Sequence, residues 1–194
     1  MSIYKRQTDA PAAETLLAKY QLPEWQRRHV EIVRDVAREV ADAYARRGGR
    51  VDVERVTAAA WLHDIGRSPL LAGDPRDHAE LSAIILSAEG LPELAEMARR
   101  HPVYTILDPE RAPRTLEEKI VHYADRRGGL AIVSLDERLR EQAVRYPAFA
   151  ATLERCLPLE KALERELLAP LGFAPESVGA GSQGPGAGVP GTPV

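Results

Sequence analysis

The stretch AWLHDIGR, residues 60–67, decides how the chain is interpreted. Three apolar residues run into His63 and Asp64, and Ile65 and Gly66 then end the segment. An imidazole and a carboxylate at the end of an apolar helix are either a satisfied core pair or parts of a site that holds a ligand. The choice depends on whether other polar side chains fall on apolar helix faces.

Length and composition indicate one ordinary globular domain. The 194 residues are 44% hydrophobic and 28% charged, with a net charge of −3, as in a typical soluble protein. This charge provides no basic surface for a nucleic-acid duplex, and no apolar run reaches the roughly 18 residues of a membrane span. With a single cysteine, Cys156, and no secretory signal, we expect a cytoplasmic protein without membrane partners.

Hydrophobic periodicity predicts an all-α fold without strands. The expected helices cover residues 23–47, 52–65, 75–90, 92–101, 115–127, 135–146 and 147–169. Asp52 is a predicted N-cap, Thr115 opens a capping box, and Gly66 is expected to end the second helix. The sequence therefore predicts a single compact helical domain over residues 1–173. A disordered tail rich in glycine and proline follows at 174–194.

The last helix and the two tryptophans are expected to serve the architecture. Cys156 should be a buried small hydrophobe. The leucines between 159 and 168 close the core or form the seam of a homodimer, and periodicity does not separate these readings. Trp25 and Trp61 should pack beside the histidines and exclude water.

Polar side chains on apolar helix faces are the main functional signal. His29 lies at the centre of a buried stripe, His63 lies over Val56 and Ala60, and four further histidines and aspartates are expected to turn inward. The full set is His29, His63, Asp64, His78, His101 and Asp125. Uncompensated burial of so many groups would cost several kcal/mol for each, and a bound cation is the simplest compensation. Imidazole and carboxylate without thiolate favour Fe, Mn, Zn, Co or Ni over Mg or Ca.

The ordered pattern His … His-Asp … Asp resembles the signature of the HD superfamily of metal-dependent phosphohydrolases, and residues 63–66 spell its HDIG variant. The two additional histidines resemble the two-metal subgroup that includes the HD-type diadenosine tetraphosphate hydrolases, although Pro102 follows His101 where that subgroup has threonine. The resemblance implies one metal held by His29, His63, Asp64 and Asp125, and a second held by Asp64, His78 and His101.

The same resemblance implies hydrolysis of a nucleotide or another small phosphoester or phosphoanhydride, such as a dinucleoside polyphosphate. One or two divalent transition metals would activate the attacking water. Asp64, Arg67 and Lys119 are the expected catalytic residues, with the two cations contacting phosphate. Arg126 and His122 fan out beside Asp125, and His122 could support a ligand, donate to substrate or lie on the surface.

Two alternatives to hydrolysis remain at this point. Some di-iron HD proteins cleave carbon bonds with oxygen, so an HD-type oxygenase is one. A non-catalytic, nucleotide-binding regulatory module is the other, and its hallmark would be an incomplete ligand set. All six ligand positions are filled in this sequence, which favours an enzyme.

Overall fold

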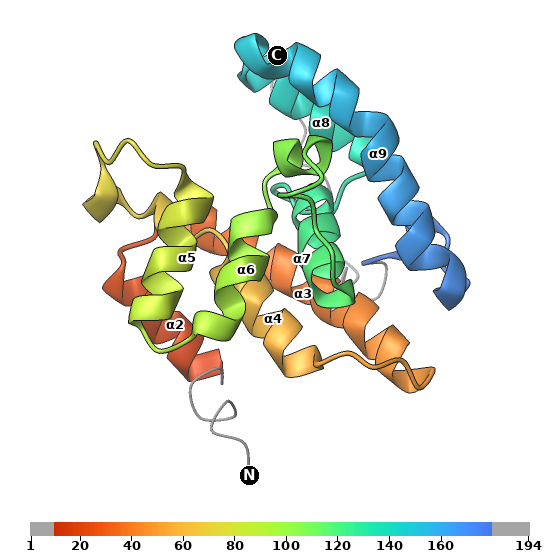
Figure 1. Ribbon diagram of the computed structural model, residues 1–194, viewed down its shortest axis with the longest axis horizontal. Helices are drawn as coiled ribbons and strands as arrows, with labels where there is room; N and C mark the ends of the chain where they lie inside the picture. The colour runs from red at the N-terminus through yellow and green to blue at the C-terminus, as the bar shows by residue number, and fades with distance from the viewer. Residues whose placement is uncertain (1–9, 180–194) are drawn as a thin grey trace, which may run out of the picture.

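Eight α-helices and six short 3-10 helices make up the part of the chain that the computed structural model describes, residues 10–179 (Figure 1). The α-helices are α2 (Ala10–Lys19), α3 (Glu24–Arg46), α4 (Val53–Leu62), α5 (His78–Ala88), α6 (Pro92–Arg100), α7 (Leu116–Arg127), α8 (Leu135–Arg145) and α9 (Ala150–Leu168). The 3-10 helices are η1 (Ile65–Arg67), η2 (Pro69–Leu71), η3 (Val103–Leu107), η4 (Pro147–Phe149), η5 (Ala169–Leu171) and η6 (Pro175–Ser177). No strand occurs in this range, so the all-α prediction is confirmed.

The helix starts follow from local capping. The Asp52 side chain accepts from the backbone N–H of Arg55 at the start of α4. Thr115 and Glu118 form the capping box of α7, as predicted. Each such cap satisfies a backbone donor that the helix itself leaves free, and contributes roughly 1 kcal/mol.

Gly66 has a different role from the predicted helix end. Helix α4 stops at Leu62, and Gly66 lies inside η1. A Cβ on Gly66 would lie 2.1 Å from the carbonyl oxygen of His78 and 2.6 Å from the backbone nitrogen of Ser82. The glycine thus lets the start of α5 pack directly on the turn that carries Asp64.

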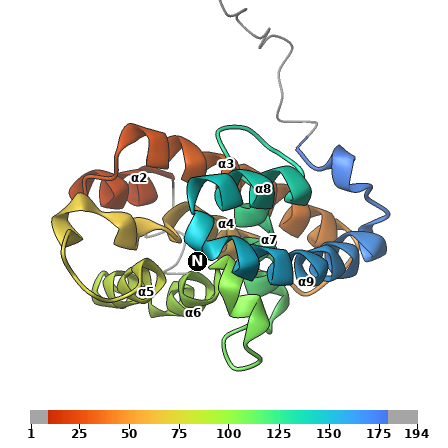
Figure 2. The same cartoon turned by 90° about the horizontal axis from the view of Figure 1, so that it is seen from above.

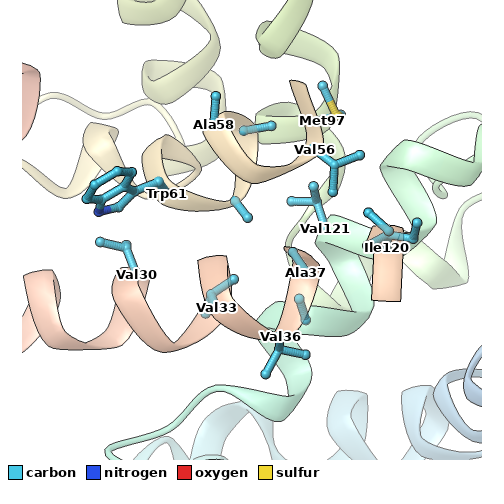
Figure 3. Close-up of a cluster of buried hydrophobic side chains, with 14 of the residues drawn as sticks. Val30, Val33, Val36, Ala37, Val56, Ala58, Trp61, Met97, Ile120 and Val121 are labelled. Atoms are coloured by element: carbon cyan, nitrogen blue, oxygen red, sulfur yellow. The ribbon is translucent and has the colours of Figure 1, made fainter. Parts of the chain in front are cut away.

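The core lies between α3, α4 and α7, with α6 closing one side (Figure 3). Apolar residues at helical spacing meet there, and the labelled examples are Val30, Val33, Val36, Ala37, Val56, Ala58, Trp61, Met97, Ile120 and Val121. Full burial of a side chain such as valine or leucine contributes about 1.5–3 kcal/mol. This packing fixes the axes of the three helices that carry most of the polar residues singled out above.

Two helix pairs flank this core (Figures 1 and 2). Helices α5 and α6 pack as a pair beside α4, and α8 and α9 pack as a pair beside α7. Leu163, Leu167 and Leu168 of α9 are buried in the core, whereas Leu159 is exposed. Most of this leucine stripe therefore closes the core, and Cys156 is fully buried as predicted.

The two ends of the described chain differ from expectation. Helix α2 was not predicted, because one short apolar turn after a proline gives little periodicity. It packs on α4, and its Leu17 belongs to the buried core. The predicted tail begins too early: Arg127 donates to the Pro175 carbonyl, and Val178 is buried. Val178 belongs to the main core cluster, whose members come from helices distant in sequence, so composition alone could not reveal its burial. Residues 180–194 of that tail lie outside the described range.

Between residues 10 and 179, no helix has both the length and the hydropathy that crossing a bilayer requires.

Candidate metal centre

Five helices and the turn after α4 bring the six predicted ligands together. His29 comes from the middle of α3, His63 caps α4, and Asp64 follows it. The other three lie at the start of α5, directly after α6, and near the end of α7: His78, His101 and Asp125. All are buried except His78, which is partly exposed. Residues almost 100 positions apart thus share one polar pocket in an apolar surrounding.

Asp64 lies between two groups of imidazoles. Its Oδ1 atom is 3.4 Å from His78 Nε2 and 3.3 Å from His101 Nε2. Its Oδ2 atom is 3.8 Å from His29 Nε2 and 3.7 Å from His63 Nε2. The two oxygens therefore face different ligand pairs, which is the arrangement that a carboxylate shared by two cations requires.

Asp125 completes the group around His29 and His63. Its Oδ1 atom lies 3.2 Å from His29 Nε2 and 3.7 Å from His63 Nε2. Three overlapping sets of donors, each within 4.8 Å, emerge from these side chains: His29, His63 and Asp64; His63, His101 and Asp125; Asp64, His78 and His101. Every predicted ligand belongs to at least one set.

The hydrogen bonds of two buried histidines test whether this site fits a metal. Nδ1 of His63 lies 2.6 Å from the Ala60 carbonyl, and Nδ1 of His101 lies 2.6 Å from the Ala98 carbonyl. Because a carbonyl only accepts, each Nδ1 carries the hydrogen, and the Nε2 lone pair faces the carboxylates. Within the described chain, His63 Nε2 and Asp64 Oδ1 have no hydrogen-bond partner. Buried lone pairs that lack a donor fit a bound cation.

Burial also sets the protonation of the cluster. Desolvation lowers the pKa of His29, His63 and His78 to about 4, and that of His101 well below its usual range. These imidazoles are neutral at neutral pH, which is the form that binds metals. Burial alone would raise the pKa of Asp64, but Arg67 and the adjacent histidines hold it well below its usual range.

Two arginines and one glutamine hold the carboxylates. Arg67 Nε lies 2.8 Å from Asp64 Oδ2, so the predicted cation is at the site. Arg126, buried beside it, donates to Asp125. Gln26, which sequence reasoning missed, donates from Nε2 to Asp64 Oδ2 at 2.6 Å. Its position three residues before His29 on the same helix face was the available signal.

A cleft of about 500 Å³ leads to the Asp64–Asp125 side of the cluster. Its inner wall carries His29 and Arg126, and its outer wall comes from α8 and the residue that follows it. The lining residues of that outer wall are Arg138, Glu141, Gln142, Arg145 and Tyr146. None of them was expected at the site, because helical periodicity does not reveal which neighbour a helix will face.

Lys119 and Trp25 differ from their predicted roles. Lys119 pairs with Glu166 of α9 at 2.6 Å and is not one of the described residues that line the cleft. The Lys119 side chain therefore pairs with α9, which packs beside α7, and not with Asp125. Trp25 lines the cleft but is 58% exposed, so it does not seal the histidines from water. Trp61 is buried in the core, as expected.

His122 lies in the interior rather than on the surface. Its Nδ1 atom is 3.0 Å from the Arg100 carbonyl, and its Nε2 atom is 2.8 Å from Glu160 Oε1. Both His122 and Glu160 are buried. The pair joins α7 to α9 and to the residue before His101, so the surface alternative is wrong and the supporting one agrees with these contacts.

A protein-family model matches the part of the chain that carries these residues. The family model described as HD domain matches residues 27–128, just over half of the chain. The chain belongs to the HD domain family. This membership and the clustered histidines and aspartates are consistent with binding of divalent metal.

Two curated proteins are similar to this HD domain protein. An uncharacterized protein of Methanocaldococcus jannaschii is 39% identical over 108 residues, which cover 50% of this chain and 62% of that protein. A tRNA (cytidine(56)-2'-O)-methyltransferase of Thermoplasma volcanium is 31% identical over 140 residues, which cover 66% of this chain and 38% of that protein. The chain thus spans less than two thirds of either relative. No solved structure matches it.

Proposed function

We propose that this protein is a metal-dependent phosphohydrolase that acts on a nucleotide or another small phosphoester or phosphoanhydride. The observation that carries the proposal is Asp64, whose two oxygens face different pairs of neutral histidines while Arg67 lies against it. A site that combines ligands for two cations with adjacent arginines suits a phosphate group better than a neutral substrate.

The proposed ligands form two groups that share Asp64. His29, His63, Asp64 and Asp125 would hold one ion, and Asp64, His78 and His101 the other, with the short distances within each group in support. Bound divalent ions would supply a water acidic enough to attack at neutral pH and would offset the charge on phosphate. Gln26 would keep Asp64 oriented between the two groups.

Arg67 and Arg126 would act on the substrate. Each now pairs with a carboxylate of the proposed ligand set. Their planar donor pairs would also suit phosphate oxygens beside the bound ions. Burial lowers the pKa of Arg126 to about 10, so this guanidinium remains charged at neutral pH.

The cleft suits an anionic substrate, which favours hydrolysis of a phosphate compound over the oxygenase alternative. Its lining includes the four arginines Arg67, Arg126, Arg138 and Arg145. Its volume of about 500 Å³ is in the range of small-molecule sites. A dinucleoside polyphosphate, which the resemblance to that hydrolase subgroup implies, therefore belongs in any substrate panel.

The test combines metal analysis with an assay of phosphate release. Untagged wild-type protein is compared with Asp64→Asn, and Asp42→Asn, a surface carboxylate on α3, is the matched control. We expect one or two transition-metal equivalents per chain in wild type and control, with phosphate released from part of a nucleotide panel. Both properties should be lost in Asp64→Asn.

The other outcomes separate the alternatives. Metal that is bound without any phosphate release would favour the oxygenase reading, and oxygen consumption would then be measured. Metal-free wild-type protein that cannot be reconstituted, yet binds nucleotide, would favour a regulatory module. Either result would overturn the phosphohydrolase proposal.

A further inference from the structure

A second hollow, of about 140 Å³, opens beside the His78 and His101 end of the ligand cluster. Unlike the larger cleft, it has one mainly apolar wall, formed by Pro102, Val103, Tyr104, Phe149 and Leu153. On the side toward the cleft it shares Arg67 and Arg126 with that cleft. The site therefore has a large charged lobe and a small apolar lobe that meet at the candidate ligands.

The apolar wall is firmly supported from behind. Val103 and Leu153 belong to a second buried cluster, which also contains Leu139 and Cys156. This cluster joins η3 to α8 and α9 and is separate from the main core. The shape of the hollow is therefore set by packed side chains rather than by a loop alone.

Two rings form the rest of the wall. Tyr104 and Phe149 meet edge to face, with centroids 6.0 Å apart. The Tyr104 hydroxyl donates to Asp77 at 2.6 Å, which anchors the polar end of that ring on a residue outside the hollow's lining. Burial raises the pKa of Tyr104 to about 12, so the ring stays neutral over the working range of pH.

We propose that this hollow binds a planar aromatic ring of the substrate, such as a nucleobase, while the phosphate lies against Arg67 and Arg126. The inference rests on the proposed function for the position of the phosphate. An apolar wall with aromatic edges suits a flat ring. Against this apolar wall, a second phosphate or a sugar would lose hydration without receiving hydrogen bonds in return.

The volume of the hollow and the residues that form it favour a single ring over a larger ligand. A volume of about 140 Å³ is far below the roughly 300–1,000 Å³ of ordinary ligand pockets, so it suits one ring system and excludes a peptide. Phe149 and Leu153 lie beyond the residues 27–128 that the family model matches. The apolar lobe thus depends on how this chain docks α9 against η3.

The experiment compares two probes that differ only in the base, adenosine 5′-monophosphate and ribose 5-phosphate. Steady-state kinetics gives kcat and KM for any probe that is turned over, and titration calorimetry gives Kd where a probe is not. Wild type should favour the nucleotide by about tenfold or more, chiefly through KM or Kd, since filling an apolar pocket gives discrimination of this order.

The chain offers a matched pair of variants, because it has only two phenylalanines. Phe149→Ala should reduce the preference for the nucleotide severalfold and leave ribose 5-phosphate unchanged. Phe173→Ala, partly buried against the main core at a distance from the hollow, should retain the wild-type preference. Leu153→Trp should fill the hollow and abolish the preference if the variant folds.

A wild type that binds both probes equally would overturn the inference, as would a Phe149→Ala variant with an unchanged preference. These results are distinct from failure of the proposed function. A protein that hydrolyses ribose 5-phosphate as well as the nucleotide is still a phosphohydrolase. A protein that hydrolyses neither probe can still show the base preference in Kd.

Discussion

The ligand-bearing helices α3–α7 and the covering helices α8 and α9 contribute to the same site in different ways. All six candidate ligands lie between His29 and Asp125, within the range that matches the HD domain. The cover contributes instead part of the lining of the two lobes, such as Arg138 of α8 and Phe149 of η4, between α8 and α9. Under the proposed function, the first region would hold the metal ions and the second would contact the substrate.

The two regions also differ in burial. The ligand half places charged and polar groups inside an apolar core, where an unsatisfied group is costly and each position has little freedom. The cover places its polar groups on the wall of an open cleft. Substitutions in the first region should therefore affect metal binding, and those in the second should affect substrate binding.

The largest effect is expected from a ligand substitution. His63→Ala removes a fully buried imidazole whose Nδ1 is already committed to a backbone carbonyl. Metal content should fall, and hydrolysis should decrease by roughly three orders of magnitude or more, because the ion provides the nucleophile. Elemental analysis and initial rates measure both quantities.

His122→Asn is the control for that change, since His122 is also a buried histidine but pairs with Glu160. This variant should keep its metal even if its stability falls. Loss of metal from the His122→Asn variant would contradict a purely supporting role for His122. Retention of metal by the His63→Ala variant would contradict the role of His63 as a ligand.

A smaller effect is expected from the glutamine that orients Asp64. Gln26→Leu removes the 2.6 Å hydrogen bond to Asp64 Oδ2 without removing a ligand. Metal affinity or activity should fall by about 10–100-fold, as measured by competition with a chelating dye. Gln142→Leu, the matching change on the cover, should leave metal affinity unaltered. Equal metal affinities for the two variants would argue against an orienting role.

Arg138→Ala probes the cover directly. Its guanidinium lines the cleft and pairs with Glu141, and its buried Nε has no hydrogen-bond partner in the described chain. KM for a phosphorylated substrate should rise by about tenfold, the usual worth of one hydrogen bond to a charged group, with metal content unchanged. Arg140→Ala, exposed on the same helix, is the control and should match wild type. An altered metal content in Arg138→Ala would mean that the covering helices also affect metal binding, contrary to the expected difference between the two regions.

The smallest effect concerns the pH dependence of stability in metal-free protein. The pKa of His29, His63 and His78 is about 4 in the folded chain, against an ordinary 6.5. Between pH 4 and pH 6.5 the unfolded chain binds more protons than the folded chain. The free energy of unfolding is therefore greatest above pH 6.5 and falls as the pH decreases toward 4. From pH 6.5 to 5.5, each of these histidines should lower the free energy of unfolding by about 1 kcal/mol.

Urea denaturation at the two pH values measures this change. His63→Ala should show a weaker pH dependence, because it lacks one of the four imidazoles whose pKa burial lowers. A wild-type midpoint that does not change between pH 6.5 and 5.5 would mean that these imidazoles are not held neutral by burial.

The sequence specified much of the helical frame, for reasons that are local. Asp52 and Thr115 cap their helices as predicted, because a side-chain oxygen and a backbone N–H only three residues away suffice. The spacing of His29 within its stripe placed it on the buried face of α3. Helix α2 has no comparable signal, and its burial depends on α4.

The candidate site was predictable only in part. The sequence indicated which six histidine and aspartate side chains turn inward and meet, because helical periodicity fixes the face on which each residue lies. The tertiary structure alone decided that Arg126 rather than Lys119 meets Asp125, and that Gln26 holds Asp64. It also placed Arg138 and Phe149 on the site walls. These contacts depend on how helices distant in sequence pack together, which no local spacing encodes.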